Sequence, residues 1–139
     1  EERMYGPKAI LFCGYAADEH QPLANALEQI GFGDRPVIFV TDSDAEKQVK
    51  EVLAYQSQAG MGQPSALARA TIMSGFTQQE AHLLMNAYRQ AGLPGQLWAT
   101  VTPASESWTV AALLTELAAE AEAFRKKQAE KDSSPDGDK

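Results

Sequence analysis

The chain contains two copies of one pattern, and this internal repeat restricts the possible folds more than any other feature. When the sequence is shifted by 61 positions, residues 9–53 align with residues 70–114 without a gap, and 12 of the 45 pairs are identical. A composition of this kind would give roughly three identities by chance. The two halves are therefore expected to fold into two equivalent units.

Each half has the pattern of a strand, a helix, a second strand and a second helix. Short apolar runs predict the strands at residues 9–13, 37–40, 70–74 and 97–101. This order predicts an α/β fold in which two β-α-β-α repeats form a four-stranded, mostly parallel, doubly wound sheet with helices on both faces. A pseudo-twofold axis along the strands would give the strand order 2-1-3-4, with the first strand of each half at the centre. A ferredoxin-like arrangement of two strand–helix–strand units is the alternative.

The composition of the connecting segments indicates where the domain begins and ends. We expect a single domain over residues 1–127, built from repeats at 9–55 and 70–120 that are joined by a flexible, glycine-rich linker at 56–68. The polar residues 128–139 predict a disordered tail.

The overall composition argues against several classes of protein. The net charge of −7 and the pI near 4.8 leave no basic surplus to bind the phosphates of a nucleic acid. No apolar run approaches the ~20 residues of a membrane-spanning helix, which predicts no membrane insertion. The single cysteine allows no intramolecular disulfide. We expect a soluble protein in a reducing compartment, either the cytoplasm or, if the non-Met start reflects a removed transit peptide, an organelle stroma.

The carboxyl ends of the central strands are the expected place for a ligand. In a doubly wound sheet a crevice forms where the strand order reverses, and helix N-termini at its rim favour an anion. Neither half has a lysine or a nucleotide-binding glycine motif at this position. A small-molecule or nucleotide-binding regulatory domain is therefore the alternative function, and the candidate crevice residues are Cys13, Gly14, Thr41, Ser74, Gly75 and Thr102.

The other polar residues predict structural roles. Cys13 lies in an apolar run without a histidine base and is expected to be a buried, inert thiol, although an enzyme that uses its thiolate is a third hypothesis. His20 and His82 do not match between the halves and are expected at the surface. Asp42 and Asp44 are interpreted as N-caps of a helix. We expect no catalytic residues, no metal site and no cofactor.

Trp98 and Trp108 have no counterpart in the first half, where Val37 and Lys47 stand instead. Aromatic residues confined to one copy either fill the core or anchor a partner. Together with the long last helix and the acidic surface, they favour a non-enzymatic accessory module that binds a protein partner in a larger complex. The accessory module is the leading hypothesis, with Trp98 and Trp108 as the partner-contact candidates.

The second half also resembles a known family. The resemblance rests on a Gly75-Phe76 turn, a Val101-Thr102-Pro103 strand end, Trp108-Thr109 and Leu113-Leu114, within residues 72–120. This pattern is similar to a small bacterial family of uncharacterised domains. The family carries no known activity, so the resemblance implies neither a catalytic residue nor a ligand. The first half departs from the pattern: Asp42 replaces Pro103, and Lys47-Gln48 replaces Trp108-Thr109.

Overall fold

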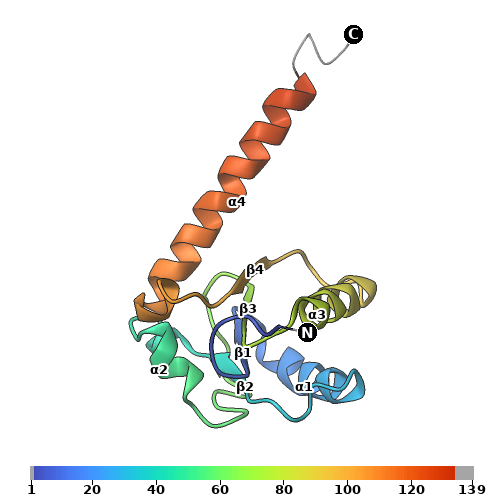
Figure 1. Cartoon of the computed structure of the whole chain (residues 1–139), viewed down its shortest axis with the longest axis vertical. Helices are drawn as coiled ribbons and strands as arrows, with labels where there is room; N and C mark the ends of the chain where they lie inside the picture. Colours follow the sequence, from blue (N-terminus) through green and yellow to red (C-terminus); the bar gives the residue numbers. More distant parts are fainter. Residues whose placement is uncertain (1, 134–139) are drawn as a thin grey trace.

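The chain folds into a four-stranded sheet with helices on both faces, and one helix extends far from the body (Figure 1). The structure is a computed structural model that describes residues 2–133. Short 3₁₀ turns precede α1, α2 and α4. The strands are β1 (Ala9–Cys13), β2 (Val37–Val40), β3 (Ala70–Ser74) and β4 (Leu97–Thr100), and the helices are α1 (His20–Gln29), α2 (Val49–Leu53), α3 (Gln78–Gln90) and α4 (Val110–Ser133).

The strand order is β2-β1-β3-β4, which confirms the predicted order and the α/β class. β1 pairs with β2 in parallel, and so does β3 with β4, because α1 and α3 form the crossover connections that parallel neighbours need. The central pair differs from the predicted geometry, because β1 and β3 run antiparallel, with Leu11 opposite Ile72. The operation that exchanges these strands is a twofold axis perpendicular to the sheet rather than along the strands.

The orientation of the central pair could not be read from the strands themselves. Every residue of β1 and β3 is buried. Strands that are buried on both faces have no polar face to show which way they lie beside a neighbour. Both orientations of the central pair therefore fit the same apolar runs.

Two separate cores result, one on each face of the sheet. α1 and α3 cover one face, and α2 and the base of α4 cover the other (Figure 1). Successive strand residues alternate between them, so Phe12 faces α1 and α3 whereas Leu11 faces α2 and α4. The first core is rich in aromatic residues and the second in branched aliphatic residues.

The N-terminal ends of α2 and α4 contact each other on the face of the sheet that these two helices cover. The Val49 N–H donates to the carbonyl of Trp108 (2.9 Å), and the Val110 N–H donates to the carbonyl of Lys47 (2.9 Å). These donors lie 61 positions apart, as do the two acceptors. The two hydrogen bonds thus join the same two segments in opposite directions.

The segment at 56–68 is bound to the domain, contrary to the flexible linker that we predicted. The Phe39 N–H donates to the carbonyl of Ala59 (2.9 Å), and the Gln58 N–H donates to the carbonyl of Val37 (2.5 Å). These bonds satisfy backbone groups on the outer edge of β2, which would otherwise be an open sheet edge. Glycine-rich composition predicted mobility, but the sequence gives no sign of this long-range pairing.

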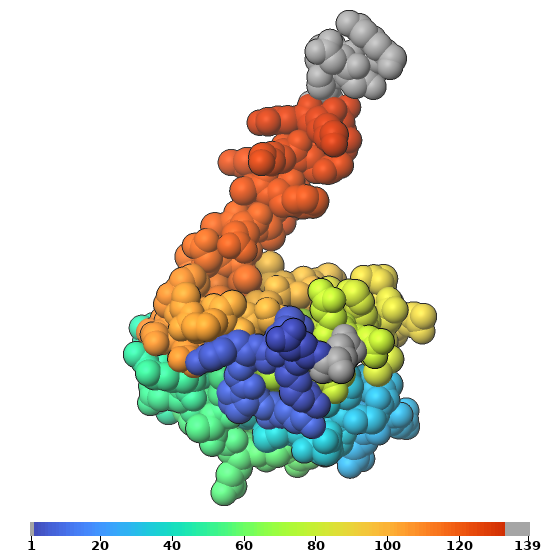
Figure 2. All heavy atoms as spheres, viewed as in Figure 1, coloured from blue at the N-terminus to red at the C-terminus, as the bar shows by residue number. Residues whose placement is uncertain are grey.

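Helix α4 extends beyond the domain. Val110, Leu113 and Leu114 are buried against the sheet, whereas residues 118–132 are exposed with the exception of the half-buried Ala121. At 1.5 Å per residue the part beyond Leu117 is about 24 Å long, and Figure 2 shows it as a rod standing away from the body. Residues 128–133, predicted to be disordered, continue this helix because Gln, Ala, Glu and Lys are strong helix formers. The rest of the predicted tail, 134–139, lies outside the described residues.

Candidate functional site

The antiparallel central pair divides the predicted crevice. Cys13 lies opposite Ala70, and Ser74 lies opposite Ala9, so the carboxyl ends of β1 and β3 are at opposite ends of the sheet. Cys13, Gly14 and Thr41 therefore gather at one end, and Ser74, Gly75 and Thr102 gather at the other. The structure does not bring the six predicted residues together.

Each of these two ends is covered by another part of the chain. A Cβ atom added at Gly14 would clash with the backbone of Leu67 and Ala68. One added at Gly75 would lie 2.7 Å from the carbonyl oxygen of Gly6. Both glycines have positive φ angles, +74° and +68°, a conformation that glycine adopts without strain. They permit a sharp turn beneath a covering segment and border no open crevice.

The threonines at these ends act within their own turns. The Thr41 hydroxyl donates to Asp44 Oδ2 (2.9 Å), which also accepts from the Thr41 N–H (3.0 Å). The Thr102 hydroxyl accepts from the Ser105 N–H (3.0 Å). Although burial raises the pKa of Asp44, the hydrogen bonds from Thr41 and Tyr55 outweigh it and leave that pKa below its ordinary value. Asp44 is thus not the N-cap that we predicted: Thr41 holds that position, and the Asp44 carboxylate completes a capping box by accepting from the Thr41 N–H.

The capping interpretation is wrong for Asp42. Its Oδ1 accepts from the N–H of Ala66 (2.8 Å) and from the hydroxyl of Ser65 (3.0 Å). Asp42 therefore holds the 56–68 segment. A carboxylate beside a turn suggests a local cap. The contact with Ala66 could not be predicted from the neighbouring residues, because Ala66 lies 24 positions away in the sequence.

Cys13 is buried, as predicted, with 0% of its surface exposed. Burial, with a smaller contribution from the charge of Asp44, raises the pKa of its thiol to about 12. The thiolate that a nucleophile requires is therefore scarce at neutral pH.

His20 is not at the surface, contrary to our prediction, whereas His82 is exposed. His20 is 3% exposed, stacks on the ring of Phe39 (4.1 Å between centroids) and accepts from the Gly62 N–H at Nδ1 (2.8 Å). Burial lowers its pKa, which favours the neutral form that accepts this bond. It is a second attachment point for the 56–68 segment.

A groove lies between α1 and the C-terminal end of α3 with the residues that follow it. Its volume is about 380 Å³, and its walls are apolar, with Leu23 and Ala26 on one side and Ala91 and Leu93 on the other. A narrower apolar extension continues between the helices to Trp98, whose ring meets that of Tyr88 edge-on (5.3 Å). Trp98 is thus packed on the core and also lines a surface groove.

A charged cluster closes one end of this groove. Arg69 donates from Nη1 and Nη2 to the two carboxylate oxygens of Glu19 (2.9 and 3.0 Å), and from Nε to the Tyr88 hydroxyl (2.8 Å). Its guanidinium lies 4.0 Å from the ring centre of Tyr15. The hydrogen bonds with Arg69 hold the pKa of Glu19 below its ordinary value. Every nitrogen of this guanidinium has a partner, so the cluster is complete without a ligand.

A related cluster lies on the other side of the same core. Arg35 Nη2 donates to Glu80 Oε2 (3.1 Å), and the guanidinium carbon lies 4.4 Å from the ring centre of Phe32 and 4.9 Å from that of Phe76. The hydrogen bond from Arg35 is the main cause that lowers the pKa of Glu80 to about 2. Glu19 and Glu80 lie 61 positions apart, as matching residues of the two halves do, but Arg35 and Arg69 lie only 34 positions apart. No pattern in the sequence therefore indicated either arginine.

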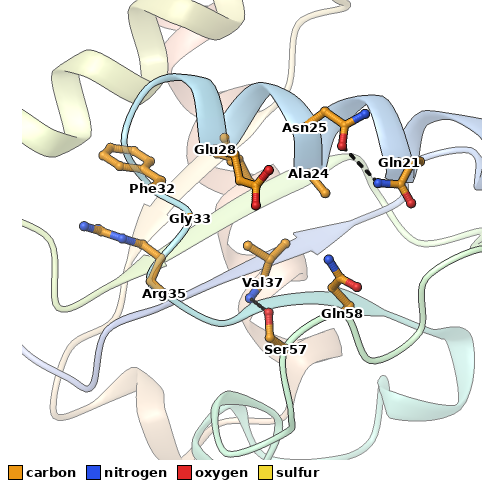
Figure 3. A pocket seen from close by; sticks show the side chains of 11 residues that line it. Gln21, Ala24, Asn25, Glu28, Phe32, Gly33, Arg35, Val37, Ser57 and Gln58 are labelled. Atoms are coloured by element: carbon orange, nitrogen blue, oxygen red, sulfur yellow. Dashed lines mark hydrogen bonds between the residues drawn. The ribbon is translucent and has the colours of Figure 1, made fainter.

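A small polar hollow of about 120 Å³ lies between α1 and β2 (Figure 3). Gln21 donates to Asn25 along α1 (3.0 Å), and the Ser57 hydroxyl accepts from the Val37 N–H (3.1 Å). In Figure 3 the Arg35 guanidinium points away from Ser57. These two bonds engage Gln21, Asn25 and Ser57, whereas the buried Nε and Nη1 atoms of Arg35 have no hydrogen-bond partner among the described residues.

Five large apolar side chains remain exposed in the described part of the chain: two lie on α4 or just before it, Leu83 lies on α3 and Leu93 lies just after it. Phe124, in its projecting part, is 69% exposed, and Trp108, two residues before its first turn, is 39% exposed. Tyr5 is also exposed, and its hydroxyl donates to Glu106 (2.9 Å). Trp108, one of the two partner-contact candidates, is therefore partly exposed at the surface.

The described residues offer neither a membrane-spanning helix nor a metal site. No helix within residues 2–133 is long and apolar enough to cross a membrane, and no group of three His, Cys, Asp or Glu in that part of the chain is placed to hold a metal ion.

The comparisons with known proteins indicate a similarity to a domain family. No curated protein and no solved structure matches the chain significantly. Residues 69–124, which run from Arg69 through β3, α3 and β4 to Phe124 in α4, are similar to an uncharacterised domain family described as a domain of unknown function (DUF3783).

Proposed function

We propose that the protein is a non-enzymatic assembly module that binds a protein partner through the projecting part of α4. The observation that carries this proposal is the exposure of residues 118–132, with Phe124 held in water at 69% exposure. An isolated helix of this length is only marginally stable in water, so a partner would contribute to keeping it formed. The family match extends into this projection as far as Phe124, which supports a role for it in the domain.

The engagement of the reactive side chains supports a non-enzymatic role. The Cys13 thiol is buried and protonated at neutral pH. The carboxylates of Glu19 and Glu80 are held in ion pairs with Arg69 and Arg35. The carboxylate of Asp44 caps its own turn. Groups with these partners are already occupied in structural bonds.

Site-specific photo-crosslinking in the protein's own host cells tests the docking role. A photoreactive phenylalanine analogue at position 124 is expected to crosslink to a protein. The same analogue at Leu83, which is exposed on α3, is the matched control and should give no defined product. Absence of a protein adduct from position 124 in correctly folded chain would overturn the proposal.

A small-molecule site in the groove between α1 and α3 is the second candidate function. The specific observation in its favour is a hollow of about 380 Å³ with apolar walls, a size typical of ligand pockets. Native mass spectrometry of protein purified gently from its source should then show a retained mass of a few hundred daltons. The variant A26F, which fills the groove, should lose that mass, and F124A should keep it.

We infer as well that the two halves are structural repeats, which explains how the domain is assembled. This inference is supported by the equivalent hydrogen bonds of Val49 and Val110 and by the matching glycine turns at Gly14 and Gly75. Glu19 and Glu80 add a third equivalence, since each bonds an arginine of the other half.

A further inference from the structure

The projecting part of α4 has the side-chain pattern of a helix that pairs with another helix. Val110 and Leu114 are buried against the sheet, and the same spacing of four and three residues continues to Leu117, Ala121 and Phe124. This is the spacing of the seam of a coiled coil. Beyond Leu117 the body of the domain no longer covers it.

Acidic and basic residues are unevenly distributed along α4. Residues 110–122 carry three glutamates and no basic residue, whereas residues 123–133 carry four basic residues against two acidic ones. Helices that pair in the same direction would set acidic against acidic and basic against basic halves. Helices that pair in opposite directions would set each acidic half against a basic half.

We propose that the occupant of this seam is α4 of a second copy of the chain, paired antiparallel; the inference rests on the proposed docking role of α4. In this register Ala121 of each copy faces Phe124 of the other, just beyond Leu117, which packs on the core of its own chain. Each of these two layers then joins a small residue to a large one. Parallel pairing would instead stack Phe124 on Phe124 and Ala121 on Ala121, which packs unevenly.

The same register allows two equivalent ion pairs between the copies. Glu120 and Lys127 both flank the seam, and Glu120 of each copy lies level with Lys127 of the other. Glu122 is already paired with Arg125 within its own helix, so the charges left to act between copies at the centre are Glu120 and Lys127. A short interface of this kind predicts a dimer that is concentration-dependent and weakened by salt.

Sedimentation equilibrium of the purified full chain tests the pairing. The mass should rise from 15.0 kDa toward twice that value with concentration. F124A should weaken dimerisation by at least about tenfold, because it removes the largest side chain of the seam. L83A, which shortens an exposed leucine on α3, is the control and should leave it unchanged. A chain that stays monomeric at millimolar concentration would overturn the proposal.

Charge reversal tests the direction of the helices. In the antiparallel dimer E120K or K127E alone should weaken pairing by roughly three- to tenfold, since each creates two like-charge contacts, and E120K/K127E should restore it. In a parallel dimer Glu120 would lie near Arg125 and Lys127 near Asp132, so the double variant would be worse than either single one. Failure of the rescue would overturn the antiparallel arrangement. K126E, on the outward side of the helix, is the matched control.

Disulfide trapping gives an independent test of the direction. The chain E120C/K127C should form covalent dimers through two interchain bonds, because these positions are about 10 Å apart within one helix and cannot bridge there. Q128C alone should not, since copies of residue 128 adjoin only in a parallel pair. The buried Cys13 does not interfere. Rapid Q128C dimers without E120C/K127C dimers would overturn the proposal.

The outcomes separate this inference from the proposed function. If position 124 crosslinks to a different protein in cells while the purified chain remains monomeric, the docking role stands and self-pairing fails. If position 124 crosslinks to no protein and the chain is monomeric, both fail.

Discussion

Glu19 and Glu80 show how single residues join the two halves of this molecule. Each glutamate accepts from a backbone N–H at the start of its own helix, that of Ala16 (2.8 Å) or Thr77 (2.9 Å). Each also binds an arginine of the other half. A residue that the sequence indicates as a local cap is thus also a cross-link between distant segments.

The Glu80 ion pair predicts a specific loss of stability in acid. The pKa of Glu80 is lowered to about 2 in the folded protein, below its value in an unfolded chain. The stabilisation is therefore present above the unfolded pKa and is lost as the pH falls from about 5 toward 2. The loss should be about 1 to 3 kcal/mol, because the carboxylate is partly solvated.

Urea unfolding of E80Q checks this expectation. The variant should be less stable than the parent at pH ~7, because it removes the nearer of the two carboxylates that pair with the buried Arg35. Its free energy of unfolding should then fall less than that of the parent on acidification. E116Q, which alters an exposed glutamate on α4, is the control. Equal acid sensitivity of E80Q and the parent would contradict the role of this ion pair.

Cys13 gives a second prediction at this scale. With its surface fully buried and the pKa of its thiol near 12, native protein should react with a thiol reagent on the order of a thousand times more slowly than unfolded protein. The measurement is the rate of absorbance change with a chromogenic disulfide at neutral pH, with and without denaturant. Fast labelling of folded protein would return the thiolate enzyme to consideration.

At the scale of elements, the order of the strands was predictable and their orientation was not. Apolar runs ended by Gly14 and Gly75 located β1 and β3, and the repeat placed both at the centre of the sheet. The antiparallel pairing depends on contacts between segments far apart in sequence, so the crevice derived from parallel strands does not form. The positions of His20 and Asp42 escaped prediction for the same reason, since each binds the 56–68 segment.

The coverings over the two glycine turns predict unequal effects of alanine substitution. G14A should cost about 3 kcal/mol or more, because the new Cβ meets backbone of residues 67 and 68 in addition to the strain of a positive φ. G31A is the matched control, because Gly31 also has a positive φ but nothing lies within 4 Å of its Cβ position. Its cost should be about 1 to 2 kcal/mol. Thermal or urea unfolding of both variants measures the difference, and equal costs would show that the covering segment yields.

At the scale of the whole molecule, the two halves share both cores. Leu11 and Ile72, from different halves, pair at the centre of the sheet and belong to one core. Helices from both halves cover each face. Neither half therefore has a core of its own to unfold separately.

This arrangement predicts a single cooperative transition. L11A, in the first half, should lower the free energy of unfolding by about 2 to 5 kcal/mol. It should shift the transition seen by tryptophan fluorescence, which reports only on the second half, as much as that seen by far-ultraviolet circular dichroism. I72A, its partner across the central pair, should behave alike. A fluorescence transition that L11A leaves in place would show that the halves unfold independently.

Each glycine turn is covered by a segment of the other half. Leu67 and Ala68 cover Gly14, and Gly6 and Pro7 cover Gly75. The covering segment is in each case the one that leads into the first strand of its half, β3 for Leu67 and Ala68 and β1 for Gly6 and Pro7. A peptide bond broken among the exposed residues 62–64 would leave every one of these contacts intact. Two fragments separated at that point should therefore associate and restore the fold without a covalent connection between them.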